Sequence, residues 1–283
     1  MPFLSREVYK YRLSLMHQLM DRARFDALIF TTADFFQFAT NFLVDVLPWE
    51  RPIAVVIPRN GEPRAIMNEL STHHTMMARE RDQLWIKDIA FYAEHPKVST
   101  RQYLLPQLPD MAAAMLGEMG LSRSRIGLDA PAAFLLRAAS ALTELRLIPC
   151  TGDMRSLRWV KHAEELDVMR AAASLSDWVQ ERYRENIRVG RLVQELDYQM
   201  ATLMVEEAAK RFPAGTNLEV MRCWSLSGPA SASPHGDGAS CGARIGKGDV
   251  LVNIVIPRVN GIAVENERTW LVGQPSGDQR RFF

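Results

Sequence analysis

The stretch VLVNIVIPRVNGIAVENERTWLV, residues 250–272, decides how the second half of the chain folds. Residues 250–256 are apolar except at Asn253, a pattern typical of a strand covered on both faces. The Asn260-Gly261 pair is a strong signal for a tight hairpin turn. We therefore expect two antiparallel strands, with the return strand over residues 262–272.

The return strand carries three charged residues, Glu265, Glu267 and Arg268. An unpaired charge buried in a sheet costs several kcal/mol, so these residues need partners. A substrate or metal pocket is the leading explanation. An internal ion pair between Arg268 and one glutamate is the structural alternative, since such networks are common.

The register of this hairpin decides which side chains meet. A two-residue turn with strict pairing places Asn253 opposite Arg268 and puts both glutamates on the other face of the sheet. Only a bulge or a longer turn would bring Asn253, Glu265 and Glu267 together, and Pro257 is a natural place for a bulge. We expect that bulge. In the alternative reading, Asn253 simply bonds to backbone within the sheet.

A second candidate is His235, which follows Pro234 in a loop rich in serine and glycine, residues 225–240. Histidine side chains titrate near neutral pH and serve as general acids and bases. On spacing alone, a lone loop histidine is more often solvated than catalytic.

Composition excludes several classes of function. The 283 residues carry a net charge of +1, which gives no electrostatic case for binding nucleic acid or an anionic membrane. No signal peptide or apolar run of membrane-spanning length is evident. Three widely spaced cysteines fit reduced thiols better than a disulfide framework or zinc site. We expect a cytoplasmic protein.

The hydrophobic pattern predicts two domains. Residues 1–153 alternate between helix and strand, which indicates an α/β domain with a partly parallel sheet. We expect residues 64–67 to form a hairpin with residues 51–58. The predicted helices are 6–24, 33–42, 105–120 and 131–145, and the predicted strands are 25–32, 51–58, 64–67, 125–129 and 146–149.

The boundary is expected near residues 150–154, a short polar link. Beyond it, residues 163–187 and 191–211 predict two long helices, followed by strands and loops, as in an α+β domain. Ser276 begins a helix-like pattern just before the sequence stops. We therefore expect that the second domain, residues 154–283, is only part of a longer domain.

Several segments together resemble the creatinase, aminopeptidase P and prolidase family. The resemblance implies an α/β creatinase-like N-terminal domain followed by a partial α+β domain of the pita-bread fold. It rests on the order and spacing of motifs across nearly the whole chain. They are the helix and strand of residues 9–30, residues 38–42 (FATNF), residues 155–161 (RSLRWVK), Pro234-His235, residues 248–250 (GDV), and residues 267–269 (ERT) with 273–276 (GQPS).

The sequence departs from this family at the positions of its metal ligands. Its metallopeptidases carry one aspartate on each of the two hairpin strands, whereas here those positions fall on Asn253 and Glu265. A neutral asparagine cannot bridge two cations as a carboxylate does. We therefore assign no metal ligand, with Glu265 as the one candidate. A divalent ion (manganese, cobalt or zinc) remains the alternative for a full-length protein.

The ERT triplet resembles the creatinase branch, which hydrolyses a C–N bond without metal. The resemblance implies that His235 is the general acid and base, and that Glu267 orients a cationic substrate group. Asn253, Glu265 and Arg268 would line the substrate site.

Three hypotheses for the function follow. The first is a creatinase-like hydrolase of an amide or amidine bond in a small substrate, inactive as this fragment. The second is a metal-dependent Xaa-Pro aminopeptidase or dipeptidase acting on short peptides. The third is a non-catalytic homologue acting as a binding or dimerisation module. The resemblance also implies a homodimer.

Overall fold

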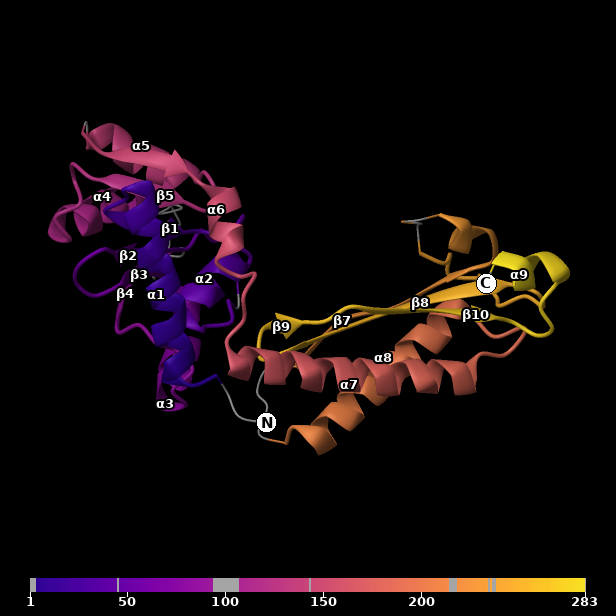
Figure 1. Ribbon diagram of the computed structural model, residues 1–283. Helices are drawn as coiled ribbons and strands as arrows, with labels where there is room; N and C mark the ends of the chain where they lie inside the picture. Colours follow the sequence, from indigo (N-terminus) through magenta and orange to yellow (C-terminus); the bar gives the residue numbers. More distant parts are fainter. Residues whose placement is uncertain are drawn as a thin grey trace, which may run out of the picture. The chain divides into compact units, whose positions relative to one another are not determined.

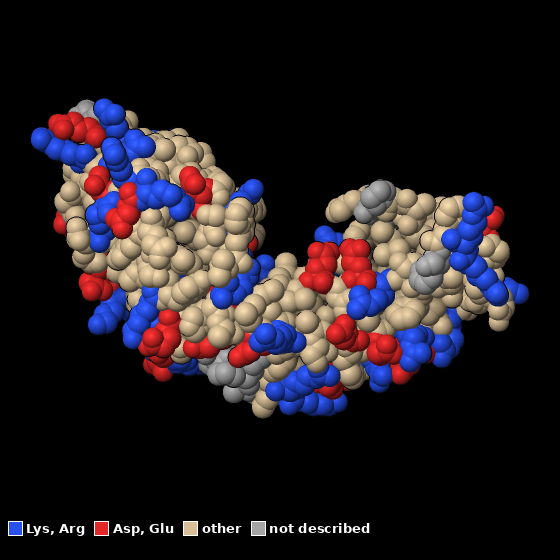
Figure 2. Space-filling model, in the orientation of Figure 1, with Lys and Arg blue, Asp and Glu red and all other residues tan. Residues whose placement is uncertain are grey.

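The computed structural model describes residues 4–44, 46–93, 107–142, 144–213, 218–233, 235 and 238–282. The chain forms two compact units, which divide after His162 (Figure 1). Among the described residues, no helix combines the length and apolar character that a membrane span requires. Figure 2 shows basic and acidic side chains interspersed on the visible face of each unit.

The first unit is built on a six-stranded mixed sheet with the order β4-β3-β2-β1-β5-β6. The central strand β1 pairs antiparallel with β2 and parallel with β5. β2 and β3 form the predicted hairpin, while β4 was not predicted. The strands are β1 (Ala27–Phe30), β2 (Ala54–Pro58), β3 (Arg64–Asn68), β4 (Asp88–Tyr92), β5 (Arg125–Leu128) and β6 (Arg146–Pro149).

Two apolar cores cover the two faces of this sheet, which confirms the predicted α/β architecture. Because side chains alternate along a strand, β1 sends Leu28 and Phe30 into one core and Ala27 and Ile29 into the other. Helices α1 (Arg6–Ala23), α2 (Ala33–Thr40) and α3 (Thr72–Glu80) contribute to the first core, and α4 (Gln107–Glu118) and α5 (Ala133–Ala141) to the second. A short 3-10 helix, η1 (Glu69–Ser71), leads into α3.

Asp129 ties the end of β5 to the start of α2. Its side chain is only 1% exposed. The backbone N–H groups of Thr31 and Thr32 donate to its two oxygens at 2.8 to 3.0 Å, and both threonine hydroxyls donate as well. The carboxylate thus satisfies donors that would otherwise be orphaned where β1 ends and α2 begins.

The predicted link over residues 150–154 is instead part of a short helix, α6 (Thr151–Ser156). Cys150 and Met154 are buried in the first core, and the Thr151 hydroxyl donates to the Asp129 carbonyl at 2.5 Å. These contacts hold α6 in the first unit. The boundary predicted between residues 153 and 154 therefore lies inside this helix.

The second unit packs two helices on one face of an antiparallel sheet, as Figure 1 shows. Helices α7 (Ala163–Asn186) and α8 (Val193–Arg211) match the two long predicted helices. The sheet order is β10-β8-β7, with β9 paired to β8. The strands are β7 (Leu218–Ser227), β8 (Val250–Val259), β9 (Ile262–Ala263) and β10 (Asn266–Leu271); the remaining elements are η2 (Gly228–Ala232) and α9 (Gly277–Phe282).

The predicted turn between β8 and β9 is confirmed. Asn260 and Gly261 both have positive φ, 46° and 78°, as a two-residue turn of the primed type requires. One register then runs without a shift from the pair Val259–Ile262 next to the turn to the pair Val250–Leu271 at the far end.

Gly127 in β5 supplies a test of how tightly the first unit is packed. A methyl group at this position would lie 2.9 Å from side-chain atoms of Phe25, Leu28 and Cys150. We expect Gly127→Ala to lower the free energy of unfolding by about 1–3 kcal/mol, because overpacking forces these side chains apart. Urea denaturation of the full chain measures this change.

Gly117 in α4 is the matched control, because a methyl group there has its nearest contact at 3.7 Å. Gly117→Ala should raise stability by roughly 0.5–1 kcal/mol, the usual gain in a helix. Equal effects of the two substitutions would contradict this account of the β5 packing.

Candidate functional site

The hairpin register separates the predicted site residues into two groups. Asn253 pairs with Arg268, and both side chains lie on the face that α7 and α8 cover. Glu265 and Glu267 alternate with the buried Asn266 and are exposed on the opposite face.

The expected bulge at Pro257 does not occur between β8 and its hairpin partners. The Pro257 carbonyl accepts from Val264 at 3.2 Å, so the register continues past the proline. The register shift lies on the other side, in β7 between Val220 and Arg222, where these residues pair with Pro257 and Ile256. Asn253 therefore does not share a pocket with the two glutamates.

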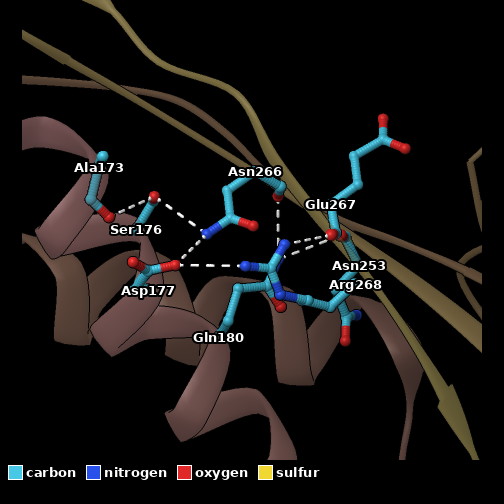
Figure 3. A network of polar contacts seen from close by, with 8 residues as sticks. All are labelled: Ala173, Ser176, Asp177, Gln180, Asn253, Asn266, Glu267 and Arg268. Atoms are coloured by element: carbon cyan, nitrogen blue, oxygen red, sulfur yellow. Dashed lines mark hydrogen bonds and ion pairs between the residues drawn. The ribbon is translucent and has the colours of Figure 1, made fainter. Parts of the chain in front are cut away.

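On the helix-covered face, β10 is bound to α7 through a polar network (Figure 3). The Asn266 amide donates to Ser176 Oγ at 3.2 Å and to Asp177 Oδ1 at 2.8 Å. The Gln180 amide donates to the Asn266 carbonyl at 2.9 Å. Figure 3 shows Glu267 pointing away from α7, on the other side of the strand.

Arg268 belongs to this network and is half-exposed. Its Nη2 lies 3.4 Å from Asp177 Oδ1, and its Nη1 donates to the Glu267 carbonyl at 2.7 Å. An exposed pair of this kind contributes little to stability. The predicted ion pair within the hairpin is thus replaced by a contact with a carboxylate on α7.

Asn253 is fully buried and ends a chain of hydrogen bonds from the two helices. Its amide donates to Ser225 Oγ at 2.6 Å. The Ser225 hydroxyl donates in turn to Asp197 Oδ1, which also accepts from the Tyr183 hydroxyl at 2.8 Å. The Ser225 N–H donates to Asp197 Oδ2 at 3.1 Å.

Burial is the main cause of the pKa shifts in this series of hydrogen-bonded residues. Loss of solvent raises the pKa of Asp197 from 3.8 to about 6, although the bonds from Ser225 and Tyr183 act in the opposite direction. Burial also raises the pKa of Tyr183 and raises that of Cys223 to about 12, with the nearby Asp197 charge adding to both shifts.

His235 is exposed in a turn of the loop after β7. Its neighbours Pro234, Gly236 and Asp237 lie outside the described residues. The returning part of the loop packs on Trp224, because a Cβ on Gly238 would come within 2.5 Å of Trp224 Nε1.

Trp224 links this loop to the acidic strand. It pairs with Ile254, which pairs with Glu267, so the three side chains form one row across the sheet. That row lies on the face that the helices leave uncovered. The next row on this face ends in Glu265, two residues before Glu267. The part of the loop that begins at Gly238 and both glutamates thus share one face.

The donor set of this region does not fit a two-metal centre. Within the described residues, no group of three or more histidine, cysteine or acidic side chains is placed to hold a metal ion. Asn253 points away from Glu265 and uses its amide on Ser225. Glu265 and Glu267 supply two carboxylates, and no described residue adds a third ligand to them.

Sequence reasoning missed Asp197, Tyr183 and Gln180. The signal for Asp197 was present, because it lies among the apolar positions of α8, between Val193 and Met200. An acidic residue on a buried helix face requires hydrogen-bond partners, which Tyr183 and Ser225 provide here.

Comparison with known families matches both units. Residues 12–160, which are 149 of the 283 residues, match the family described as creatinase/prolidase N-terminal domain. Residues 167–283 match metallopeptidase family M24. A search of curated proteins found no match.

Solved structures share the fold. Dipeptidase PepE from Mycobacterium ulcerans has a TM-score of 0.73 and 22% identity, over 98% of this chain and 68% of that one. A prolidase from Thermococcus sibiricus has a TM-score of 0.74 and 21% identity, over 96% and 68%. The N-terminal domain of FACT complex subunit SPT16 from chickpea has a TM-score of 0.67 and 16% identity, over 97% and 68%. The chain spans about two thirds of the length of these structures.

The raised pKa of Asp197 predicts how pH affects stability. A carboxyl group whose folded pKa exceeds its unfolded value contributes stability below the unfolded pKa, and this contribution is lost as pH rises through the folded value. The asparagine of Asp197→Asn does not titrate. Between about pH 3.8 and 7, we therefore expect the free energy of unfolding of this variant to rise by about 3 kcal/mol relative to that of the unsubstituted chain. Urea denaturation at several pH values measures the difference.

Asp177→Asn is the control, because this carboxylate is 63% exposed. If the free energy of unfolding of Asp197→Asn differed from that of the unsubstituted chain by the same amount at every pH, the Asp197 carboxyl group would not be desolvated as described.

Proposed function

Because the chain belongs to the creatinase/prolidase family and its second unit matches metallopeptidase family M24, we propose that it is a hydrolase of a C–N bond in a small substrate. The predicted family and fold class are confirmed by these matches and by the shared fold. The creatinase-like character, with an amide or amidine substrate, is our more specific proposal.

The observation that carries this proposal is the row from Trp224 through Ile254 to Glu267. The loop that bears His235 packs on Trp224, at one end of the row. Glu267 stands exposed at the other end. We propose that a substrate lying on this face has the imidazole group of His235 on one side and the carboxylate of Glu267 on the other.

These two groups suit hydrolysis of a substrate with a cationic end. Glu267 would bind an amidinium or ammonium group through charge-assisted hydrogen bonds. His235 would accept a proton from the attacking water as the new C–O bond forms. It would then return that proton to the leaving nitrogen as the C–N bond breaks. Glu265, on the same face, would add a second carboxylate, and Arg222, whose guanidinium lies 4.8 Å from the centroid of the Trp224 ring, would offset part of that charge.

The proposal changes the roles of two predicted residues. Asn253 and Arg268 face the helices, so we assign them to the support of the sheet and not to substrate binding. We route no step through a metal ion, because the donors that the structure describes on this face do not form a two-metal set.

A second candidate is a metal-dependent Xaa-Pro dipeptidase. It is favoured by the match to a metallopeptidase family and by Glu265, a carboxylate on the open face. A third candidate is a non-catalytic binding module. It is favoured by the shared fold of a domain described as part of a subunit of a complex.

Activity assays on the full chain with a guanidinium compound, an amidine and an Xaa-Pro dipeptide test the proposal. We expect turnover of a cationic substrate to survive exhaustive chelation. His235→Ala should lower kcat by about 10²–10⁴-fold, the usual contribution of a general acid and base. Glu267→Gln should raise KM by about tenfold or more, through loss of a charge-assisted bond.

His73→Ala is the matched control, because His73 is an exposed histidine of α3 in the first unit. Dipeptide hydrolysis that is abolished by chelation and restored by manganese or cobalt would favour the second candidate. Absence of turnover for every substrate would favour the binding module.

A further inference from the structure

The first unit contains a crevice where the connections after two neighbouring strands leave toward opposite faces of the sheet. β1 and β5 are neighbouring parallel strands. β1 leads into α2, whose Phe36 lies in the first core, whereas β5 leads into α5, whose Leu135 lies in the second. Connections that leave neighbouring parallel strands toward opposite faces open a crevice at the carboxyl ends of those strands.

A cavity of about 620 Å³ occupies this crevice. Both junctions line it, through residues 31–33 after β1 and residues 130–134 after β5. The loop before β2 and the first turn of α4 complete the walls. This volume falls within the range of small-molecule sites in proteins.

One half of the crevice already holds a carboxylate that belongs to the chain. Asp129 accepts the N–H groups of Thr31 and Thr32 at the start of α2, and that of Ala130 at 2.7 Å. These donors are satisfied. The Asp129 charge also disfavours a second anion close to α2.

The other half offers the guanidinium group of Arg137. Arg137, in the second turn of α5, is the single charged residue among the described residues that line the cavity. It is exposed, and no acceptor for its guanidinium is found in the described part of the chain. Ala132, which precedes α5, has no side chain that could cap the helix. This end of the crevice therefore favours one negative charge.

The remaining walls are apolar. Leu108 and Phe134 come from the second core, and Pro48 and Pro52 flank the opening with Trp49. Trp49 is 80% exposed, which is unusual for so large an apolar side chain. A bound aromatic group would cover part of this surface.

We propose that this crevice is a binding site for a small aromatic carboxylate. The aromatic body lies between Trp49, the prolines and Phe134, and the carboxylate is bound by Arg137. A carboxylate is preferred over a phosphate because the described lining offers one cation and a dianion would be repelled by Asp129. The site lies wholly in the first unit and is independent of the hydrolase proposed above.

Isothermal titration of the full chain with 1-naphthaleneacetate and with its neutral amide, 1-naphthaleneacetamide, tests the proposal. We expect the acid to bind about tenfold more tightly than the amide, as one charge-assisted bond implies. Arg137→Gln should bring the affinity for the acid down to that of the amide and leave the amide unchanged. Ala133→Trp, an exposed position on the cavity wall, should block both probes.

Arg146→Gln is the matched control, because Arg146 is an exposed arginine of β6 outside the cavity lining. It should bind both probes normally. The circular dichroism spectrum of each variant reports whether it is folded. The proposal would be overturned by equal affinity for the acid and the amide, or by no saturable binding of either probe. It would also be overturned if Arg137→Gln did not weaken binding of the acid, or if binding persisted in Ala133→Trp.

Discussion

The two positive φ angles of the Asn260–Gly261 turn are the constraint on which the second unit depends. They allow a two-residue turn, and that turn fixes which residues of β8 and β10 pair. Because side chains alternate between faces, a shift of one residue would exchange every side chain between the helix face and the open face. The turn thus determines that Glu267 is exposed and that Asn266 is buried.

The surroundings of residue 253, on the sheet face that α7 and α8 cover, explain why a neutral amide fits at this position. Asn253 donates to Ser225, which donates to the buried Asp197 carboxylate. An aspartate at position 253 would have no hydrogen to donate and would place a second negative charge near Asp197. Both charges would lack solvent, which is costly in a protein interior. The hydrogen-bond chain through Tyr183 accordingly contains a single carboxylate, that of Asp197.

Much of the fold was predictable from local patterns, but the site was predictable only in part. The stripes of apolar residues on α7 and α8 and the Asn-Gly turn were readable, because each depends on residues close in sequence. The placement of the bulge was not, because Pro257 faces two neighbouring strands and sequence alone does not decide which one shifts. The helical state of α6 was also hidden, since it depends on the burial of Met154 against distant elements.

Asp129 has a consequence for how the chain is made. The donors it satisfies lie 97 and 98 positions earlier in the sequence, at the start of α2. Contacts of such large separation slow folding, because a long loop must close before they form. During synthesis on the ribosome, the β1–α2 junction must therefore wait for this carboxylate to leave the exit tunnel. Until then, the emerging segment exposes apolar strands to chaperones and proteases.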